Sequence, residues 1–424
     1  MEYYEINGGR RLVGEVVVHG AKNSVLPLLC ATALADGVSV LHNCPSLSDV
    51  EASIAILRHL GCRVTREGTT VTVDASCLSR SDVPDVLMRE MRSSIIFLGA
   101  ILARTGEADV SMPGGCELGP RPIDLHLSAL RKLGAGIEQR GGRLRCTGGT
   151  ALCGAEITLT LPSVGATENI MLCACAAEGV TVICNAAREP EIVDLARFLR
   201  AMGAHIQGEG SGTVRIEGGR GKLHGCEHRV IGDRIVCATY LSAVACAGGE
   251  ASLTGVEPEQ LAAVTGVLRD AGAEILATAP DALTIRRDRP LDGGVVVRTS
   301  PYPGFPTDAQ PVVMAALCNA RRSSLFVETM FENRYRHVDE LRRMGADIRV
   351  EDRVAVVGGT ETGLRGAAVE AHDLRGGGAL CVAALGAAGT TILTGLAHIR
   401  RGYASLPEDL RALGADITLH TEQN

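Results

Sequence analysis

Aromatic residues are scarce in this chain of 424 residues, since tryptophan is absent and aromatic side chains make up 3% of the sequence. The hydrophobic fraction is nevertheless 46%, so the core must be built from leucine, valine, isoleucine, alanine and cysteine. No stretch approaches the roughly 20 apolar residues that a transmembrane helix needs. The N-terminal segment also lacks a basic region followed by an apolar one. We therefore expect neither a membrane span nor a secretory signal.

An excess of positive charge is also lacking, because the formal net charge is −7. Proteins that bind nucleic acid or acidic membranes non-specifically need a basic surface. The sequence therefore predicts no nucleic-acid partner and no membrane partner. Any site for an anionic ligand must be a local cluster of arginine or lysine side chains.

The cysteines show no pairing pattern. There are 15 of them, an odd number, and no Cys-x-x-Cys motif occurs. Most lie inside apolar runs, as expected for small buried side chains in a reducing cytoplasm. We therefore expect a cytoplasmic location. Clustered zinc ligands are absent from the sequence, so we also expect no metal site.

One short motif, Leu-Arg-x-x-Gly, occurs six times. Its leading leucines are 73, 69, 69, 73 and 69 residues apart, at positions 57, 130, 199, 268, 341 and 410. The first, second and third copies each lie 211 residues before the fourth, fifth and sixth. Two halves of three repeated units follow from this spacing. Residues that break such a regular pattern are the candidates for chemistry.

Each repeat predicts the same order of elements, which is helix, strand, helix, strand, strand. The first helices are expected at 24–34, 93–103, 169–177, 235–245, 310–318 and 379–386, and hairpins are expected at 62–73 and 348–357. The second helix ends in the repeated motif, whose glycine suits a left-handed C-terminal cap. The fold class is therefore α/β, with two domains that each contain three units.

The sixth repeat is short of a strand, whereas the strand-like run 3–18 belongs to no repeat. We predict that this run supplies the missing strand. The domains would then be 22–230, and 1–21 together with 231–424. The chain would cross twice between them, which predicts a cleft with a hinge.

Basic residues stand where helices are expected to start. Lys22, Arg92 and Arg375 occupy such positions, although a cation there opposes the helix dipole and Ser, Thr, Asp or Asn is usual. Helix starts attract anions, so these three residues predict an anionic ligand. Lys22 and Asp233 lie 211 residues apart and are expected to be equivalent.

Two irregular segments also stand out. The segment 113–122, Pro-Gly-Gly-Cys-Glu-Leu-Gly-Pro-Arg-Pro, predicts a shaped loop in which Cys116 is accessible, unlike the other fourteen cysteines. Arg121 and the start of the next helix would lower the pKa of its thiol. The proline-rich segment 300–308 ends at Asp308, which is interpreted either as an ordinary N-cap or as a positioned carboxylate.

Several motifs together resemble the UDP-N-acetylglucosamine enolpyruvyl transferases, from about residue 4 to residue 419. They are Gly-Ala-Lys-Asn at 20–23, the 113–126 segment, Ser-Val-Gly-Ala-Thr-Glu-Asn at 163–169, Ala-Arg-Glu-Pro-Glu at 187–191, Phe-Pro-Thr-Asp at 305–308, Phe-Glu-Asn-Arg at 331–334 and Arg-Gly-Tyr at 401–403. The resemblance implies two inside-out α/β barrels. It also implies transfer of the enolpyruvyl group of phosphoenolpyruvate to the 3-hydroxyl of UDP-N-acetylglucosamine, with release of phosphate, as the first committed step of peptidoglycan synthesis.

The resemblance also assigns roles to residues. Lys22, Arg121 and Arg401 would hold phosphoenolpyruvate, with Asn23 lining that site. Cys116 would donate a proton to the methylene carbon, and Asp308 would stand near the attacking hydroxyl. Further residues would contact the nucleotide and sugar or the closed cleft: Arg92, Arg121, Pro122, Ile123, Asp124, Leu125, Leu161, Pro162, Ser163, Val164, Met330, Arg334 and Arg375. No cofactor or metal is required, the two small molecules are the expected partners, and a monomer is favoured.

Some positions depart from the family pattern. Arg400 stands where an aspartate is common, which predicts a more basic loop, and His19 replaces a small residue. Gly376, Gly377 and Gly378 follow Arg375 in place of an alanine-rich turn, which predicts a loosened helix start. Because residue 116 is cysteine rather than aspartate, we expect covalent inactivation by the epoxide fosfomycin.

Three other functions are disfavoured by the sequence. Shikimate-3-phosphate enolpyruvyl transfer uses the same fold but lacks this cysteine loop. RNA 3′-phosphate cyclase expects a nucleotide-accepting histidine and a basic surface, which the charge of −7 disfavours. A silent paralogue that binds a UDP-sugar and regulates is disfavoured by the full set of Lys22, Cys116, Asp308 and Arg401.

Overall fold

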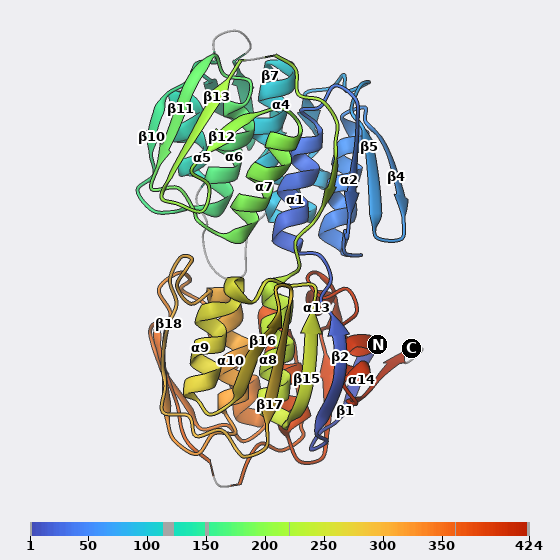
Figure 1. Cartoon of the computed structure of the whole chain (residues 1–424), viewed down its shortest axis with the longest axis vertical. Coiled ribbons are helices and arrows are strands. Elements are labelled where there is room, and N and C mark those ends of the chain that lie inside the picture. The colour runs from blue at the N-terminus through green and yellow to red at the C-terminus, as the bar shows by residue number, and fades with distance from the viewer. Residues whose placement is uncertain (1, 113–122, 149–151, 220, 361, 422–424) are drawn as a thin grey trace. The chain divides into compact units, whose positions relative to one another are not determined.

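The structure, a computed structural model, describes residues 2–112, 123–148, 152–219, 221–360 and 362–421 (Figure 1). Its contacts divide the chain into two compact units. The first unit contains the described residues of Gly20–Ile231, and the second contains those of Met1–His19 and Gly232–Asn424. The sequence prediction gives 22–230, and 1–21 with 231–424. The hinged cleft expected between the domains stays a prediction.

The first unit contains three repeats, as its elements show. These are α1 (Lys22–Thr32), β3 (Val38–His42), α2 (Ser48–His59), β4 (Arg63–Glu67) and β5 (Thr70–Asp74); β6 (Asp82–Val83), α3 (Asp85–Glu90), the 3₁₀ helix η1 (Arg92–Ile96), α4 (Phe97–Thr105), β7 (Glu107–Ser111), α5 (Asp124–Lys132), β8 (Gly136–Arg140) and β9 (Arg143–Thr147); and β10 (Glu156–Thr158), α6 (Val164–Ala174), β11 (Gly179–Cys184), α7 (Pro190–Ala201), β12 (His205–Gln207) and β13 (Thr213–Gly218). The short strand β14 (Glu227–Arg229) follows them.

The second unit begins with β1 (Glu2–Asn7) and β2 (Leu12–Val17) and continues after residue 231. Its repeats are α8 (Arg234–Ala247), β15 (Gly249–Thr254), η3 (Pro258–Leu261), α9 (Ala262–Asp270), β16 (Glu274–Ala279) and β17 (Ala282–Arg287); β18 (Val296–Arg298), η4 (Thr307–Ala309), α10 (Gln310–Leu317), β19 (Ser324–Val327), α11 (Val338–Arg343), β20 (Ile348–Glu351) and β21 (Val354–Val357); and β22 (Ala368–Glu370), α12 (Leu374–Gly386), β23 (Thr390–Thr394), α13 (Leu396–Arg400), α14 (Leu406–Ala412) and β24 (Asp416–Thr421).

Every repeat forms a four-stranded sheet of one pattern. In the third repeat the order is β10-β11-β13-β12, where the β10–β11 pair is parallel and the other pairs are antiparallel. Three such sheets surround buried helices in each unit (Figure 1), so the predicted pair of inside-out α/β barrels is confirmed. The expected hairpins 62–73 and 348–357 are β4–β5 and β20–β21.

Strands from distant parts of the chain complete three of the sheets. Strand β14 pairs with β3 and so closes the ring of the first unit. Strand β1 lies between β23 and β24, which confirms that the N-terminal run completes the sixth repeat. That prediction was wrong for the second part of the run, because β2 pairs with β15 in the fourth repeat. Gly8 and Gly9 separate the two strands, and a side chain at Gly8 would collide with the Ala384 carbonyl oxygen.

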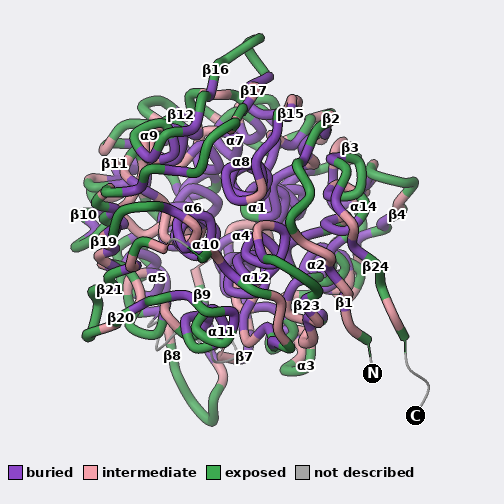
Figure 2. The backbone as a smooth tube through the Cα atoms, turned by 90° about the horizontal axis from the view of Figure 1, so that it is seen from below, coloured by how far each residue is buried: buried purple, intermediate pink, exposed green. Residues whose placement is uncertain are grey.

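The centre of the second unit is the helix trio α8, α10 and α12, which pack on one another. Nearly all of their residues are buried, as the purple tube in Figure 2 shows. The core around them contains alanine, valine, leucine and cysteine with few rings, which agrees with the scarcity of aromatic residues. In the first unit α4 packs in the same way on α6.

The repeated Leu-Arg-x-x-Gly motif ends a helix in all six repeats, as predicted. Its glycine has a positive φ each time, between 86° at Gly414 and 106° at Gly272. The residue after each glycine donates its N–H to the carbonyl of the leading leucine, as Cys62 does to Leu57. This is the Schellman arrangement, which satisfies the last carbonyl groups of the helix.

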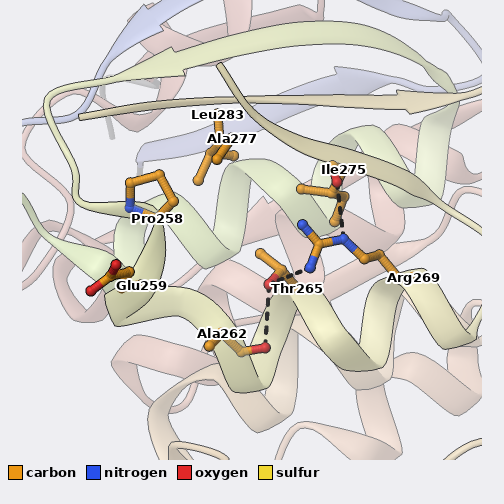
Figure 3. A pocket seen from close by; sticks show the side chains of 8 residues that line it. All are labelled: Pro258, Glu259, Ala262, Thr265, Arg269, Ile275, Ala277 and Leu283. Carbon is orange, nitrogen blue, oxygen red and sulfur yellow. Dashed lines mark hydrogen bonds between the residues drawn. The ribbon is translucent and has the colours of Figure 1, made fainter. Parts of the chain in front are cut away.

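The arginine of the motif has a role that the pattern did not indicate. Arg269 donates to the carbonyl of Ile275, six residues later, at 2.9 Å, and so ties the helix end to the next strand (Figure 3). The same i to i+6 bond occurs at Arg58, Arg200, Arg342 and Arg411. The pocket of about 180 Å³ beside Arg269 contains none of the predicted site residues. Arg269 is the arginine that lines this pocket, and its side chain makes the structural hydrogen bond to Ile275.

Candidate active site

Lys22 lies at the first position of α1, where the preceding Ala21 provides no side-chain cap. The lysine is 8% exposed, and its Nζ lies 2.7 Å from Asp49 Oδ2 in the first turn of α2. A buried lysine needs such a partner because desolvation of the charge is costly. The two helices therefore hold a cation at a helix start, and Asn23 beside it is exposed. Asp49 does not stand out in the sequence.

The equivalence of Lys22 and Asp233 was wrong by one residue. Asp233 is the N-cap of α8, where its Oδ1 accepts from the N–H groups of Ile235 and Val236. The first residue of α8 is Arg234, so Arg234 is the positional counterpart of Lys22. Arg234 is 7% exposed, and its guanidinium lies over the ring of Tyr302. The 211-residue period is set by the motifs and could not reveal this shift. The stretch from the first helix start to the motif is one residue shorter in the fourth repeat than in the first.

Arg92, the start of α5 and the start of α6 come together in the first unit. Arg92 opens η1, and burial together with the Arg92 charge lowers the pKa of His126 to about 4. A side chain at Gly165, in the first turn of α6, would lie 3.2 Å from Cε1 of His126. Asn169 Nδ2 binds both His126 Nδ1 and the Ile95 carbonyl, at 2.9 Å each.

The remaining first-unit residues of the predicted site lie beside this junction. Asp124 begins α5 and is exposed, whereas Ile123 is buried and Leu125 is half-buried. Ser163 is the N-cap of α6 and accepts from Ala166 N at 3.4 Å, so this helix begins five residues before the expected one. Pro162 and Val164 are partly exposed, and Leu161 is 52% exposed.

Asp308 is held between two buried arginines in the second unit. Its Oδ1 lies 2.5 Å from Arg334 Nη2, and its Oδ2 lies 3.2 Å from Arg375 Nη2. The carboxylate side chain is 29% exposed, whereas those of Arg334 and Arg375 are 1% and 4% exposed. Asp308 belongs to η4, which leads into α10, and it does not cap the helix with its side chain. The interpretation as an ordinary N-cap is therefore wrong.

Glu328 is a residue of this cluster that sequence reasoning missed. It is 1% exposed and accepts from Thr307 Oγ1 at 3.0 Å, next to Asp308. Its other oxygen accepts from the N–H groups of Met330 and Phe331, at 2.7 and 3.1 Å. Glu328 thereby fixes the turn that carries Met330, which is 37% exposed, relative to η4.

Arg375 lies in the first turn of α12, after the N-cap Asp373, which accepts from the N–H groups of Arg375 and Gly376. Burial alone would lower the pKa of Arg375, but the charges of Asp308 and Asp233 hold it above its ordinary value. The starts of α8, α10 and α12 therefore meet around one guanidinium. Among the described residues, its Nη1 atom is buried and lacks a hydrogen-bond partner.

The expected loosening of this helix start was wrong. Gly376, Gly377 and Gly378 are buried within α12, which begins with a satisfied cap. A side chain at Gly377 would come within 2.5 Å of Ile399, and one at Gly378 would overlap the hydroxyl of Tyr403. The glycines therefore permit close packing against the segment that carries Arg401.

Arg401 caps the end of α13 and is exposed. The neighbouring Arg400 forms an exposed ion pair with Glu2 on β1, in which its Nη1 lies 2.6 Å from Oε2. The more basic loop expected from Arg400 stays a prediction. His19 contributes its backbone carbonyl, which accepts from Asp233 N at 2.9 Å.

Cys116, Arg121 and Pro122 lie outside the described residues. The other fourteen cysteines form no disulfide, and most are buried. Two of them, Cys77 and Cys153, are exposed, so the prediction that residue 116 alone is accessible was wrong. Both lie in short surface segments after a strand or before one, outside the apolar runs on which the prediction depended.

Among the described residues, no group of three histidine, cysteine or acidic side chains is placed to hold a metal ion. Nor does any helix in those residues combine the length and apolarity that a membrane crossing demands. The chemistry available among the described residues of the two units consists of cations at helix starts, the ion-paired carboxylates Asp49 and Asp308, and partly exposed polar groups. Such groups bind and orient anionic or hydroxylated ligands.

Comparison with known proteins agrees with this chemistry. The family described as EPSP synthase (3-phosphoshikimate 1-carboxyvinyltransferase) matches residues 6–410. UDP-N-acetylglucosamine 1-carboxyvinyltransferase 2 of Caldanaerobacter subterraneus subsp. tengcongensis is 52% identical, over 98% of this chain and 99% of its own. UDP-N-acetylglucosamine 1-carboxyvinyltransferase 1 of Symbiobacterium thermophilum is 50% identical, over 98% and 95%.

Solved structures show the same fold. The enolpyruvyl transferase NikO from Streptomyces tendae has a TM-score of 0.89 and 27% identity, covering 100% of this chain and 99% of that one. An EPSP synthase from Acinetobacter baumannii has a TM-score of 0.79 with 21% identity, covering 99% and 100%, and supports the fold alone.

Proposed function

This chain belongs to the UDP-N-acetylglucosamine 1-carboxyvinyltransferases of the EPSP synthase family, and from this premise we propose that it transfers the enolpyruvyl group of phosphoenolpyruvate to the 3-hydroxyl of UDP-N-acetylglucosamine. Phosphate is the second product. The observation that carries the proposal is the identity of 50–52% over nearly the whole chain to proteins of that name. It spans both units and therefore every residue cluster described above.

The proposed site residues divide between the two units. In the first unit, Lys22, Asn23 and Arg121 bind phosphoenolpyruvate, while Arg92, Ile123–Leu125 and 161–164 receive the nucleotide. In the second unit, Arg401 completes the binding of phosphoenolpyruvate and Asp308 faces the sugar hydroxyl. The support is chemical, because phosphoenolpyruvate carries a phosphate and a carboxylate, which cations at helix starts and arginine side chains bind well.

The reaction follows from these roles. Cys116 gives a proton to the methylene carbon, and the sugar 3-oxygen bonds to the neighbouring carbon while its proton passes to Asp308. Phosphate then leaves with the electron pair of its C–O bond. The methyl carbon returns a proton to the Cys116 thiolate, which restores the double bond and yields the enolpyruvyl ether. Lys22, Arg121 and Arg401 offset the negative charge on the departing phosphate.

The paired arginines define what Asp308 contributes. Arg334 and Arg375 fix both carboxylate oxygens, so the side chain has one orientation. A carboxylate held in this way is a well-oriented acceptor, which suits a proton that departs as the C–O bond forms. Its exposed fraction of 29% leaves an edge for the sugar hydroxyl.

The test is the release of inorganic phosphate from phosphoenolpyruvate by the full chain. We expect release with UDP-N-acetylglucosamine and none without it. Shikimate 3-phosphate is the control acceptor, and preferential turnover of that acceptor would contradict the proposal. We further propose that the protein is a monomer. A cytoplasmic location is also proposed, because the described cysteines are free thiols, which a reducing compartment preserves.

A further inference from the structure

Two arginines of the proposed site, Arg375 and Arg401, are separated by 26 residues of sequence, yet their surroundings are joined by one side chain. Tyr403 lies two residues after Arg401 and is 3% exposed. The guanidinium carbon of Arg375 lies 5.8 Å from the centre of its ring, within the range of a cation–π contact. Tyr403 therefore contacts one of these arginines and lies in the same turn as the other.

The hydroxyl of Tyr403 is tied to a third element. It lies 2.9 Å from Thr239 Oγ1 on α8. The single hydrogen of the Thr239 hydroxyl goes to the Ile235 carbonyl at 3.0 Å, so the phenol donates and the threonine accepts. Movement of the buried phenol away from Thr239 would leave its hydroxyl without a hydrogen-bond partner, which costs free energy. The hydrogen bond therefore holds the ring of Tyr403 in place. Tyr403 thus links α8, α12 and the turn 399–403.

The glycines of α12 make room for this turn. Without side chains, Gly377 faces Ile399 and Gly378 faces the hydroxyl of Tyr403. Gly402 provides a reciprocal contact, since a side chain there would come within 2.6 Å of Leu374 in the first turn of α12. Residues on either side of Arg401 are therefore packed against the helix that carries Arg375. Three close approaches of this kind over five residues allow the turn very little movement.

We propose that Tyr403, seated against Gly377 and Gly378, is a positioning residue that fixes the Arg401 turn and the Arg375 guanidinium relative to each other for phosphoenolpyruvate. The inference rests on the proposed function and deepens it. It also gives a role to Gly377 and Gly378, two of the three glycines that depart from the family pattern. Tyr403 acts through the two arginines, because its own ring and hydroxyl are buried.

Three variants test this role by steady-state kinetics of phosphate release. Tyr403→Phe removes the bond to Thr239 and keeps the ring, so we expect KM for phosphoenolpyruvate to rise about two- to fivefold. Tyr403→Leu also removes the contact with Arg375, and we expect a rise of tenfold or more. Gly378→Ala displaces the ring from the opposite side and should resemble Tyr403→Leu. In all three, the Kd for UDP-N-acetylglucosamine should stay within about twofold.

The matched control is Tyr240→Phe. Tyr240 is a fully buried tyrosine of α8 in the same unit, and its hydroxyl donates to Asp409 at 2.5 Å. Its loss should lower stability as Tyr403→Phe does, while KM for phosphoenolpyruvate stays unchanged. A merely structural role for Tyr403 would make the two variants alike.

A second measurement does not depend on turnover. Hydrogen–deuterium exchange of 396–403 should be about tenfold faster in Tyr403→Leu and Gly378→Ala than in the wild type or Tyr240→Phe. If the wild type releases no phosphate but exchange responds in this way, the proposed function fails and the positioning of the turn stands. If the wild type is active and Tyr403→Leu has an unchanged KM for phosphoenolpyruvate, the inference about Tyr403 is overturned.

Discussion

Asp308 and Arg375 are joined by an ion pair in which Oδ2 lies 3.2 Å from Nη2, across 67 residues of sequence. Because Arg334 binds the other carboxylate oxygen, loss of Asp308 would leave two buried guanidinium groups without their main partner. We expect Asp308→Asn to retain the fold with a loss of about 1–3 kcal/mol in the free energy of unfolding, and to lower kcat by a factor of 100 or more. Full activity of Asp308→Ala would remove the proton-accepting role.

The ion pair also permits a double-mutant cycle. Arg375→Met should destabilise by itself, whereas its combination with Asp308→Asn should cost less than the sum of the two single changes. Urea unfolding of the four proteins measures this coupling. Additive effects would show that the pair contributes nothing to stability.

Cys116 is the proposed acid, and its replacement separates binding from chemistry. Cys116→Ala should abolish phosphate release near neutral pH or reduce it severely, while calorimetric binding of UDP-N-acetylglucosamine stays largely intact. A variant that turns over normally would contradict the assignment. The same variant should lose covalent labelling by fosfomycin, as intact mass measures. Cys77→Ser and Cys153→Ser are the controls, because those two thiols are exposed and lie outside the proposed site.

Lys22 combines a stability role with a binding role. Lys22→Met leaves Asp49 as a buried carboxylate without its 2.7 Å partner, so we expect a loss of about 3 kcal/mol in stability together with a loss of phosphoenolpyruvate turnover. Adding Asp49→Asn should recover part of the stability and none of the turnover. Lys132→Met on the exposed surface of α5 is the control and should change neither. Recovery of turnover in the double variant would show that the lysine serves only the fold.

Glu168 predicts a pH dependence of stability. It is fully buried on α6. Burial raises its pKa from 4.5 to about 8, and the negative charges of Glu191 and Glu189 contribute to this increase. The folded state therefore holds this proton between those two values while the unfolded state releases it, so stability falls as pH rises from about 4.5 to 8 and then levels off. Melting temperatures from pH 5 to 9 should fall less steeply in Glu168→Gln. Glu178→Gln on the surface is the control, and an equal slope in Glu168→Gln would contradict the burial of a protonated carboxyl.

The repeats could be predicted from the sequence because helix termination is local. Glycine is the residue that tolerates the left-handed cap, and all six motif glycines adopt it. The i to i+6 bonds of the motif arginines were not predictable, since a side chain that turns back to a later strand leaves no periodic signal. The helix starts were also displaced, because caps such as Ser163 and Asp373 act several residues before the apolar run.

The candidate site was only partly visible in the sequence. Lys22 stood out because a cation at a helix start is unusual, whereas Asp49 and Glu328 look ordinary until the fold brings them to Lys22 and Thr307. The glycines after Arg375 were misread for a related reason. Their effect depends on Ile399 and Tyr403, which lie more than 20 residues away. Pairwise tertiary contacts of this kind lie beyond a single sequence.

The seating of β1 between β23 and β24 has a consequence for biosynthesis. Strand β1 leaves the ribosome about 400 residues before its partners β23 and β24, whereas β14 lets Gly20–Ile231 close on itself well before β23 is made. The nascent chain thus carries an unpaired amino-terminal edge throughout translation of its second half. A fusion or truncation before Asn7 would interfere with the pairing of β1 with β23 and β24. It would not affect the earlier pairing of β14 with β3.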